Sequence, residues 1–317
     1  MNILVTRAAG FIGSHLAERL VETGHNVHGI DCFTDYYRPA FKRLNAEAIQ
    51  AAGVKLLELD LAEDDLVSVT AGMDVIFHLA GQPGISAETP FNTYLRNNIQ
   101  SSYRLLESVK SSKTLRGFVN ISTSSVYGAD ASGGDTSEPR PTSTHGVTKL
   151  ATEQLALSYA REGALPECSL RLFSVYGPRE RPEKLYPQLI RSVLEGKEFP
   201  LFEGSENHER SYTYVGDIVD GFMAVLENLE RCRGEIFNIG TDASITTGEG
   251  IRIIEEITGR SANFFRKPKR AGDQWKTHAN IAKARRLLDY HPSTSPRDGL
   301  AHTVNWYRDH ILGQIEF

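Results

Sequence analysis

Apolar and polar positions follow two alternating patterns through the first 175 residues. Short apolar runs predict strands at residues 2–6, 27–31, 54–60, 74–79, 117–122 and 167–173. Between these runs, apolar residues recur at helical spacing and predict helices, including long ones over residues 91–111 and 145–161. This alternation of strands and helices predicts an α/β fold built on a doubly wound parallel sheet.

The pattern changes after residue 175. A basic, proline-bearing loop over 177–184 precedes predicted helices that end near residue 194 and cover 218–228 and 248–258. One more strand is predicted at 235–240, and amphipathic helices close the chain. The stretch 129–144 is polar and contains Gly, Pro and Ser, which predicts a flexible surface loop.

The first strand–helix–strand unit contains a turn with glycines. Gly10 allows backbone N–H groups to approach a pyrophosphate, and Gly13 allows the following helix to pack closely on the sheet. Asp31 ends the second strand, where a carboxylate accepts hydrogen bonds from an adenosine ribose and repels the 2′-phosphate of NADP. A dinucleotide fingerprint has a further glycine where this chain has Arg7. The unit predicts an NAD site, with an ordinary strand–helix turn as the alternative.

Candidate chemistry also follows the fifth predicted strand. The hydroxyls of Thr123, Ser124 and Ser125 lie at its carboxyl end, where a doubly wound sheet binds its ligands. His145 and Lys149 are four residues apart and therefore share one face of the predicted helix over 145–161. These groups together predict a site that contacts a sugar.

Three further polar residues have competing interpretations. His78 lies in an apolar strand and is predicted to be a packed, hydrogen-bonded core histidine rather than a catalytic one. Asn97 and Asn98 lower the propensity of their helix, so either one makes side-chain hydrogen bonds or both face solvent. Basic residues on separate loops of the C-terminal part favour one anionic ligand, such as a diphosphate, over scattered surface charges.

Composition narrows the class of protein. The 317 residues are 40% hydrophobic and 24% charged, with a formal net charge of −5 and a sequence pI near 6.1. This balance predicts neither a nucleic acid nor an anionic membrane as partner. No apolar run approaches transmembrane length, and the chain enters a strand at once, so no signal peptide is expected. The three cysteines are far apart in sequence, which predicts no metal site, no disulfide and a cytoplasmic protein.

Several motifs together resemble the extended short-chain dehydrogenase/reductases that act on nucleotide sugars. The motifs are Gly10-Phe11-Ile12-Gly13-Ser14-His15-Leu16, Thr123-Ser124-Ser125-Val126-Tyr127-Gly128, Lys149, and Arg210 with Thr213-Tyr214-Val215-Gly216-Asp217. Within that family, three segments look most like UDP-glucuronate 4-epimerases: residues 31–39, residues 147–150 and residues 177–182. The resemblance covers essentially the whole chain.

The resemblance implies an architecture and a reaction. A Rossmann-type domain over 1–175, joined by returning segments near 211–244, would hold NAD, and residues 176–210 and 245–317 would hold the nucleotide sugar. A homodimer would form through the helices near 91–112 and 145–161. In the implied reaction a base takes the proton of the C4 hydroxyl while hydride passes to NAD⁺. The 4-keto sugar then turns over and receives the hydride on its other face.

The resemblance also implies roles for individual residues. The catalytic group would be Thr123, His145 and Lys149. The cofactor would contact Arg7, Gly10, Phe11, Ile12, Gly13, Asp31, Asp60, Leu61, Ala80, Gln82, Asn98 and Lys149. The UDP-sugar would contact Ser124, Ser125, Ser174, Lys184, Phe202, Arg210, Arg270 and Asp273.

The substrate reaction can be narrowed further. Related 4,6-dehydratases carry an Asp-Glu pair, and decarboxylases a Glu, where this chain has Ser124-Ser125, and neutral hydroxyls cannot abstract a C5 proton. Three positions depart from the family pattern: the catalytic tyrosine is His145, a fingerprint glycine is Arg7, and an arginine of glucuronate epimerases is Ser86. We expect UDP-glucuronate 4-epimerase activity that His145 impairs. The alternatives are a catalytically silent sugar-nucleotide binder, a UDP-glucose 4-epimerase or a dehydratase.

Overall fold

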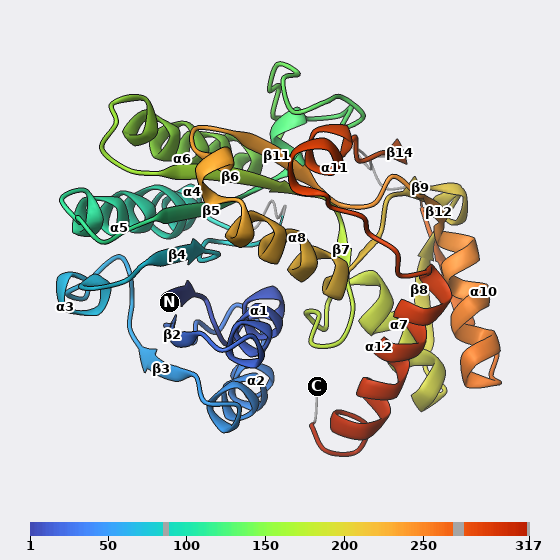
Figure 1. The fold of residues 1–317 in the computed structure, drawn as a ribbon. Coiled ribbons are helices and arrows are strands. Elements are labelled where there is room, and N and C mark those ends of the chain that lie inside the picture. The colour runs from blue at the N-terminus through green and yellow to red at the C-terminus, as the bar shows by residue number, and fades with distance from the viewer. Residues whose placement is uncertain (85–88, 269–275, 316–317) are drawn as a thin grey trace.

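A seven-stranded parallel sheet forms the centre of the computed structural model, which describes residues 1–84, 89–268 and 276–315 (Figure 1). The strand order is β11-β6-β5-β4-β1-β2-β3, so the order reverses between β1 and β4. Each strand predicted up to residue 173 is present, and the run at 235–240 supplies the last one. The bounds are β1 Asn2–Thr6, β2 Asn26–Asp31, β3 Lys55–Glu58, β4 Val75–His78, β5 Gly117–Thr123, β6 Glu167–Leu172 and β11 Ile236–Ile239.

Helices cover both faces of this sheet. Alternate strand residues, such as Ile3 and Leu4, point to opposite faces and belong to two separate apolar clusters. One cluster includes α1 (Phe11–Glu22), α2 (Pro39–Ala51), α8 (Val215–Glu227) and α11 (Ala282–Leu288). The other includes α5 (Ser101–Val109) and α6 (Thr144–Arg161), and the short α3 (Val67–Thr70) packs against α5. Within the described ranges, no helix is both long and apolar enough to span a bilayer.

The helix predicted over 91–111 is present but is not uniform. It consists of α4 (Phe91–Tyr94), the π-helical turn η1 (Leu95–Gln100) and α5. The π turn contains both Asn97 and Asn98. A π turn widens the helix locally and is often found at functional sites.

The C-terminal part contains short strand pairs that were not predicted. These are β7 (Val175–Tyr176) with β10 (Thr213–Tyr214), β8 (Glu198–Phe202) with β13 (Asn263–Lys267), and β9 (Glu209–Arg210) between β12 (Ile245–Thr246) and β14 (Lys276–Thr277). Strands of two residues are too short to show an alternating pattern. The predicted helices are present as α7 (Leu185–Glu195), α8, α10 (Thr247–Thr258) and α12 (Pro296–His310). The remaining short turns are η2 (Ser124–Tyr127), η3 (Ser205–Asn207) and α9 (Leu229–Cys232).

The segment 177–184 ties the C-terminal part to the first helix. Arg179 donates two hydrogen bonds of 2.9 Å each to Glu18 of α1, and His15 Nε2 lies 3.0 Å from the Pro178 carbonyl oxygen. A third apolar cluster around α7, α10 and α12 also includes Tyr37 and Phe41 from the segment that begins α2. The two parts of the chain therefore share one packed interface.

The segment 129–143 is an irregular loop at the surface, as predicted, but its first half is anchored to the core. Ala131 is buried in the main core, and the Asp135 carbonyl oxygen accepts a hydrogen bond of 3.2 Å from buried Arg171. The Asp135 carboxylate also accepts from the backbone N–H of Asn238 in β11. Partners distant in sequence hold this segment down, so its polar composition alone did not reveal its position.

Candidate functional site

The turn between β1 and α1 has the geometry expected of a phosphate-binding loop. Arg7 has φ = 57°, in the left-handed region that favours glycine, and its carbonyl oxygen accepts a 3.0 Å hydrogen bond from Gly10 N. A Cβ added to Gly13 would lie 2.2 Å from the Arg7 carbonyl oxygen, so only glycine fits there. Phe11 and Ile12 begin α1 and are half-buried. A non-glycine residue such as Arg7 is strained in this conformation by about 1–2 kcal/mol.

The Arg7 side chain crosses the crevice at the point where the strand order reverses. Its Nη1 donates a 3.4 Å hydrogen bond to the Gly81 carbonyl oxygen, beyond the end of β4. Its charge also contributes to lowering the pKa of Lys149 and of Lys42. The guanidinium therefore lies among the groups predicted to bind the cofactor.

Asp31 is buried at the end of β2 with one oxygen unused. Its Oδ1 accepts a 2.9 Å hydrogen bond from Phe33 N and lies 3.8 Å from Lys42 Nζ. Its Oδ2 is buried and has no hydrogen-bond partner among the described residues. A buried carboxylate oxygen without a partner is costly unless a ligand supplies the donor. A ribose hydroxyl of NAD fits this requirement.

Asp60 and Leu61, the cofactor contacts predicted after β3, already have partners within the protein. Asp60 Oδ1 accepts a 2.8 Å hydrogen bond from Ala62 N, and Asp60 Oδ2 accepts one of 2.7 Å from Arg96 Nη2. Leu61 is buried. Arg96 belongs to η1, so this contact joins the β3 end to the same π turn that contains Asn98.

The interpretation of His78 as a core residue is confirmed. The ring is fully buried, with Nδ1 3.1 Å from Thr6 Oγ1 and Nε2 2.8 Å from Ser102 Oγ. Burial lowers its pKa to about 3, so the ring is neutral. Thr6 Oγ1 also accepts a 2.9 Å hydrogen bond from Ala80 N. These bonds hold the loop after β4, which begins with Ala80, against β1.

The ends of β5 and α6 meet around Thr123. Thr123 caps η2 by accepting a 3.2 Å hydrogen bond from Ser125 N, and its Oγ1 donates one of 3.3 Å to Ser125 Oγ. A Cβ added to Gly146 would lie 2.5 Å from the Ser125 carbonyl oxygen, so glycine permits the contact between η2 and α6. The first turn of α6, which carries His145, therefore packs directly on the Thr123 turn.

His145 is half-buried beside cationic groups and has one anchored nitrogen. Its Nδ1 lies 3.2 Å from the Gln82 carbonyl oxygen, and its ring centroid lies 6.3 Å from that of Tyr94. Burial, followed by the positive charge of Lys149, lowers the pKa of His145 to about 4. The imidazole is therefore neutral at neutral pH and can accept a proton.

Lys149 lies one helical turn beyond His145 and close to the loop after β4. A Cβ added to Gly81 would lie 3.9 Å from Lys149 Nζ and 2.9 Å from Asn98 Oδ1, so Gly81 provides space for both. Burial lowers the pKa of Lys149 to about 8, although the carboxylate of Glu153 acts in the opposite direction. Lys149 thus keeps most of its positive charge at neutral pH.

The two asparagines of η1 both make side-chain hydrogen bonds. Asn98 is buried, accepts from Gln82 N at 2.6 Å and donates to Thr148 Oγ1 at 2.8 Å. Asn97 Nδ2 donates to Gln82 Oε1 at 3.0 Å. The alternative of a solvent-facing pair is wrong, because both side chains hold the segment that contacts His145.

Cationic side chains gather on the C-terminal side of this site. Desolvation by the surrounding protein lowers the pKa of Lys184, although its side chain reaches the surface, and the charges of Arg181 and Arg210 lower it further. Lys184 and Arg181 in turn both lower the pKa of His145. The structure therefore brings residues from the 177–184 loop, β9 and α6 within electrostatic reach of one another.

The other residues predicted to contact the substrate lie on several separate elements. Ser124 and Ser125 form the first turn of η2, and the Ser174 carbonyl oxygen accepts a 2.8 Å hydrogen bond from Thr213 N. Phe202 ends β8, and Lys267 Nζ lies 5.9 Å from its ring centroid. Arg270, Asp273 and Ser86 lie outside the described residues.

Two functional candidates were missed from the sequence. Lys42 is the buried partner of Asp31. Arg181 pairs with Glu183 at 2.7 Å, lies over the ring of Tyr36 with its guanidinium 5.3 Å from the ring centroid, and contributes to lowering the pKa of His145. Arg179 and Arg181 lie two positions apart in one basic loop, and the local sequence does not distinguish their roles. Only the fold directs Arg179 to Glu18 and Arg181 to Tyr36.

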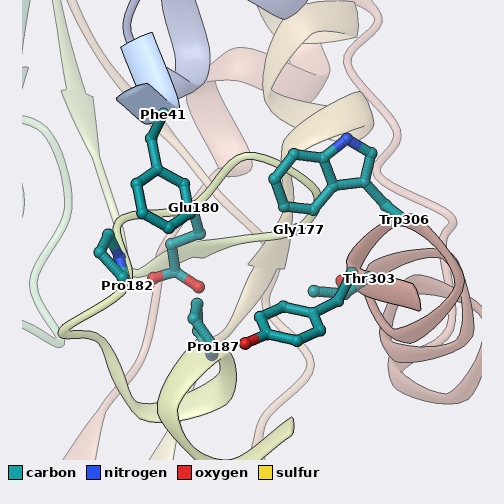
Figure 2. Close-up of a pocket in the computed structure, with 8 residues that line it drawn as sticks. Phe41, Gly177, Glu180, Pro182, Pro187, Thr303 and Trp306 are labelled. Atoms are coloured by element: carbon teal, nitrogen blue, oxygen red, sulfur yellow. The ribbon is translucent and has the colours of Figure 1, made fainter. Parts of the chain in front are cut away.

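A small pocket lies between α2, the segment after β7, and α12 (Figure 2). The Glu180 carboxyl group points into it, and burial raises the pKa of that carboxyl. None of the predicted site residues that the structure describes lines it; its lining is Phe41, Gly177, Glu180, Pro182, Pro187, Thr303, Trp306 and Tyr307. This pocket belongs to the interface between the two parts of the chain.

Comparisons with known proteins agree with the fold. The model of the NAD dependent epimerase/dehydratase family matches residues 3–240. The chain is 39% identical over 321 residues to an uncharacterized UDP-glucose epimerase, YtcB, of Bacillus subtilis (strain 168), covering 99% of this chain and 100% of that protein. It is 34% identical to UDP-glucuronate 4-epimerase 4 of Arabidopsis thaliana, covering 99% of this chain and 76% of that protein.

A solved structure gives the same result. The UDP-glucuronic acid 4-epimerase of Bacillus cereus, in complex with UDP-glucuronic acid and NAD, matches with a TM-score of 0.91 and 37% identity. The match covers 98% of this chain and 99% of that one. Together with the seven-stranded sheet and the glycine turn, these matches confirm the predicted fold and family resemblance. The chain belongs to the NAD dependent epimerase/dehydratase family.

Proposed function

We propose that this protein is an NAD-dependent 4-epimerase that interconverts UDP-glucuronate and UDP-galacturonate. The observation that carries the proposal is the environment of His145: an imidazole fixed by its Nδ1 to the Gln82 carbonyl oxygen at 3.2 Å and held neutral by burial and by the charges of Lys149, Lys184 and Arg181. A neutral base suits removal of a hydroxyl proton, and the surrounding positive charge suits an acidic sugar attached to a diphosphate. The Bacillus cereus relative, whose solved complex contains UDP-glucuronic acid and NAD, supports this choice.

NAD fits the turn between β1 and α1. The backbone around Gly10 and Gly13 would hold its pyrophosphate, and Asp31 Oδ2 would accept from a ribose hydroxyl. Asp60, Leu61, Ala80, Gln82 and Asn98 would line the rest of the cofactor. When bound, NAD supplies the hydride acceptor and donor for C4 of the sugar.

Three side chains would carry the proton chemistry. His145 would take the proton of the C4 hydroxyl, and Thr123 would share that proton through its own hydroxyl. Lys149 would bind the nicotinamide ribose, and its charge adds to the effect of burial in keeping His145 neutral. When the keto sugar presents its other face, the same groups return the proton to the C4 oxygen.

The C-terminal cations and hydroxyls would bind the substrate. Lys184, Arg210 and Arg270 would pair with the diphosphate, and the Asp273 carboxylate would accept a hydrogen bond from the ribose; Arg270 and Asp273 lie outside the described residues. Arg181 would pair with the sugar carboxylate, with the hydroxyls of Ser124, Ser125 and Ser174 around it. Phe202 would contact the uracil.

A homodimer is part of the proposal. Large apolar side chains are exposed on the 91–109 helix at Phe91, Leu95 and Tyr103, and on the neighbouring α6 at Val147. Solvent-exposed apolar stripes of this kind are typical of subunit interfaces. The division into a cofactor domain and a substrate domain stays a prediction. The cytoplasmic location also stays a prediction, and the free thiols of Cys32, Cys168 and Cys232 favour it.

The decisive experiment follows UDP-glucuronate with added NAD⁺ by chromatography, with UDP-glucose assayed in parallel. We expect slow formation of UDP-galacturonate, because imidazole is shorter than the phenol it replaces and a misplacement of about 1 Å lowers rates by roughly 10²-fold. His145→Gln should lower the rate by a further ~10²-fold or more. His145→Tyr should raise it.

The pH profile tests the same assignment. Activity should require neutral His145, with a pKa of about 4, and charged Lys149, with a pKa of about 8, so kcat/KM should fall below the first value and above the second. In His145→Tyr the acid limb should move upward, because a phenol has a reference pKa of about 10 against about 6.5 for imidazole. Fast wild-type turnover that falls in His145→Tyr would refute the impairment. No turnover of any UDP-sugar by an NAD-loaded protein would favour the silent binder.

Binding of UDP by calorimetry tests the substrate side separately from turnover. Arg210→Ala should weaken UDP binding roughly tenfold or more, because charge-assisted hydrogen bonds contribute about 1.5–3 kcal/mol. Arg266→Ala removes an exposed arginine that pairs with Glu206 at 3.0 Å and serves as the matched control. Failure of the wild type to bind UDP or UDP-glucuronate would refute the nucleotide site.

A further inference from the structure

The hydrogen bond at His145 determines which ring nitrogen carries the proton. Nδ1 lies 3.2 Å from the Gln82 carbonyl oxygen, and a carbonyl oxygen can only accept. Nδ1 must therefore donate. A neutral imidazole has a single ring proton, so Nε2 keeps its lone pair. Hydrogen-bond chemistry thus makes Nε2 the only basic nitrogen of the ring.

The charged groups that face the ring favour its neutral form. Lys149 acts from the same helix, and Lys184 and Arg181 act from the 177–184 loop, all lowering the pKa of His145. The bond to the Gln82 carbonyl acts in the opposite direction, because it also stabilises the protonated ring. The same anchor can therefore persist when Nε2 takes up a proton.

The Gln82 main chain is itself held by Asn98. Asn98 Oδ1 accepts from Gln82 N at 2.6 Å, and Asn98 Nδ2 donates to Thr148 Oγ1 at 2.8 Å. Thr148 lies three residues after His145, and its hydroxyl donates in turn to the Thr144 carbonyl oxygen at 2.9 Å. The buried amide of Asn98 thus connects the loop that carries the Gln82 carbonyl to the helix that carries His145.

We propose that Asn98 is a positioning residue that acts through the Gln82 main chain to hold His145 as the Nδ1–H tautomer and leave Nε2 as the proton acceptor. The assignment of the tautomer depends only on the hydrogen bonds. The use of Nε2 rests on the proposed function: the O–H bond of the C4 hydroxyl breaks, its proton passes to Nε2, and it returns to the C4 oxygen after the sugar turns over.

Nitrogen NMR of protein labelled in its histidine rings tests the tautomer directly. The chain has ten histidines, and His145→Gln identifies the signals of this one. In the wild type at neutral pH we expect a protonated Nδ1 and an unprotonated Nε2, without and with NAD. In Asn98→Ala we expect the Nε2–H form to appear, and in Thr148→Val a smaller shift in the same direction.

Asn97→Ala is the matched control. Asn97 neighbours Asn98 in the same π turn but bonds the Gln82 side chain rather than its main chain. Its removal should leave the tautomer unchanged. If NAD-dependent turnover is present, Asn98→Ala should lower kcat by roughly tenfold or more, as loss of the correct histidine tautomer does elsewhere, with little change in KM for the UDP-sugar.

The outcomes separate this inference from the proposed function. An Nε2–H ring in the wild type, or an unchanged tautomer in both Asn98→Ala and Thr148→Val, would overturn the inference whatever the activity. An Nδ1–H ring that depends on Asn98 in a protein without turnover would support the positioning role and refute the proposed reaction. If Asn98→Ala does not fold, Thr148→Val still decides the question.

Discussion

Two buried ion pairs of this protein differ in how fully their charged groups are hydrogen-bonded. Arg171 of β6 and Glu153 of α6 have side-chain exposures of 2% and 0% and meet through two hydrogen bonds of 2.9 and 2.6 Å. Asp31 and Lys42 are both 2% exposed, yet their charged atoms are 3.8 Å apart. Both pairs are removed from water, but only the first has the geometry of a strong bidentate contact.

The remaining hydrogen-bonding groups show what this difference means. Arg171 Nη1 also donates to Tyr127 Oη at 2.9 Å, and Tyr127 donates to Asn238 Oδ1 at 2.7 Å, so the first pair belongs to a network that joins several elements. Asp31 Oδ2 has no partner within the part of the chain that the structure describes. A completed buried pair holds the fold together, whereas an incomplete one retains an acceptor for a ligand.

Breaking the Arg171 pair should have the largest effect. Glu153→Gln leaves the buried guanidinium without a counter-charge, which should lower the free energy of unfolding by about 3–5 kcal/mol. Urea denaturation measures the loss. Replacing both partners, Glu153→Leu with Arg171→Met, should recover most of it, because no buried charge is then left alone.

An exposed pair provides the control for that experiment. Arg43 and Glu58 are 53% and 58% exposed and 3.1 Å apart, so Glu58→Gln should change the free energy of unfolding by less than about 1 kcal/mol. Equal losses in Glu153→Gln and Glu58→Gln would contradict the structural role of the buried pair.

Changing the Asp31 pair should affect ligand binding more than stability. Asp31→Asn removes a charged acceptor for a ribose hydroxyl, and such bonds contribute about 1.5–3 kcal/mol, or roughly one to two orders of magnitude in NAD affinity. Preference for NAD over NADP should fall as well. Calorimetry with both nucleotides measures this, with Asp130→Asn in an exposed loop as the control.

The loss of stability in Asp31→Asn tests the same difference between the two ion pairs. Lys42 Nζ keeps two hydrogen bonds of 3.0 Å to Thr34 after Asp31 is changed. Asp31→Asn should therefore destabilise the protein less than Glu153→Gln does. A larger loss of stability than of NAD affinity would mean that the Asp31 pair is structural and that its unused oxygen has no ligand.

The smallest expected effect concerns Arg7, which lies between the two strand ends at the cofactor turn. Arg7→Gly relieves a left-handed residue and should stabilise the protein by about 1 kcal/mol or less, since glycine also has more conformational entropy to lose. Loss of the guanidinium should lower NAD affinity roughly two- to fivefold, in the range of a partly exposed ion pair.

Arg7→Ala separates these two contributions. It removes the guanidinium but keeps the strained backbone, so it should lose NAD affinity as Arg7→Gly does without the gain in stability. Thermal unfolding with and without NAD measures both quantities. Unchanged affinity in both variants would show that Arg7 does not contact the cofactor.

Local patterns predicted a large part of this protein. The period of apolar residues predicted each strand of the central sheet and the long helices, because burial on one face imposes that period. The turn with Gly10 and Gly13 was predictable because close backbone approach excludes other residues. The core position of His78 followed from the cost of polar groups in apolar segments, whereas the sequence left the hydrogen bonding of Asn97 and Asn98 open.

Contacts between distant segments were decided only by the tertiary structure. The sequence contains Lys42 and Gln82 but does not indicate that the Lys42 ammonium lies beside Asp31 or that the Gln82 carbonyl oxygen contacts His145. The two-residue strands of the C-terminal part likewise exist only because a partner strand lies beside them. Local propensity acts over a few residues, whereas these contacts depend on how helices and loops pack on the sheet. For that reason the chemistry of the site, including which nitrogen of His145 is free, is a property of the fold.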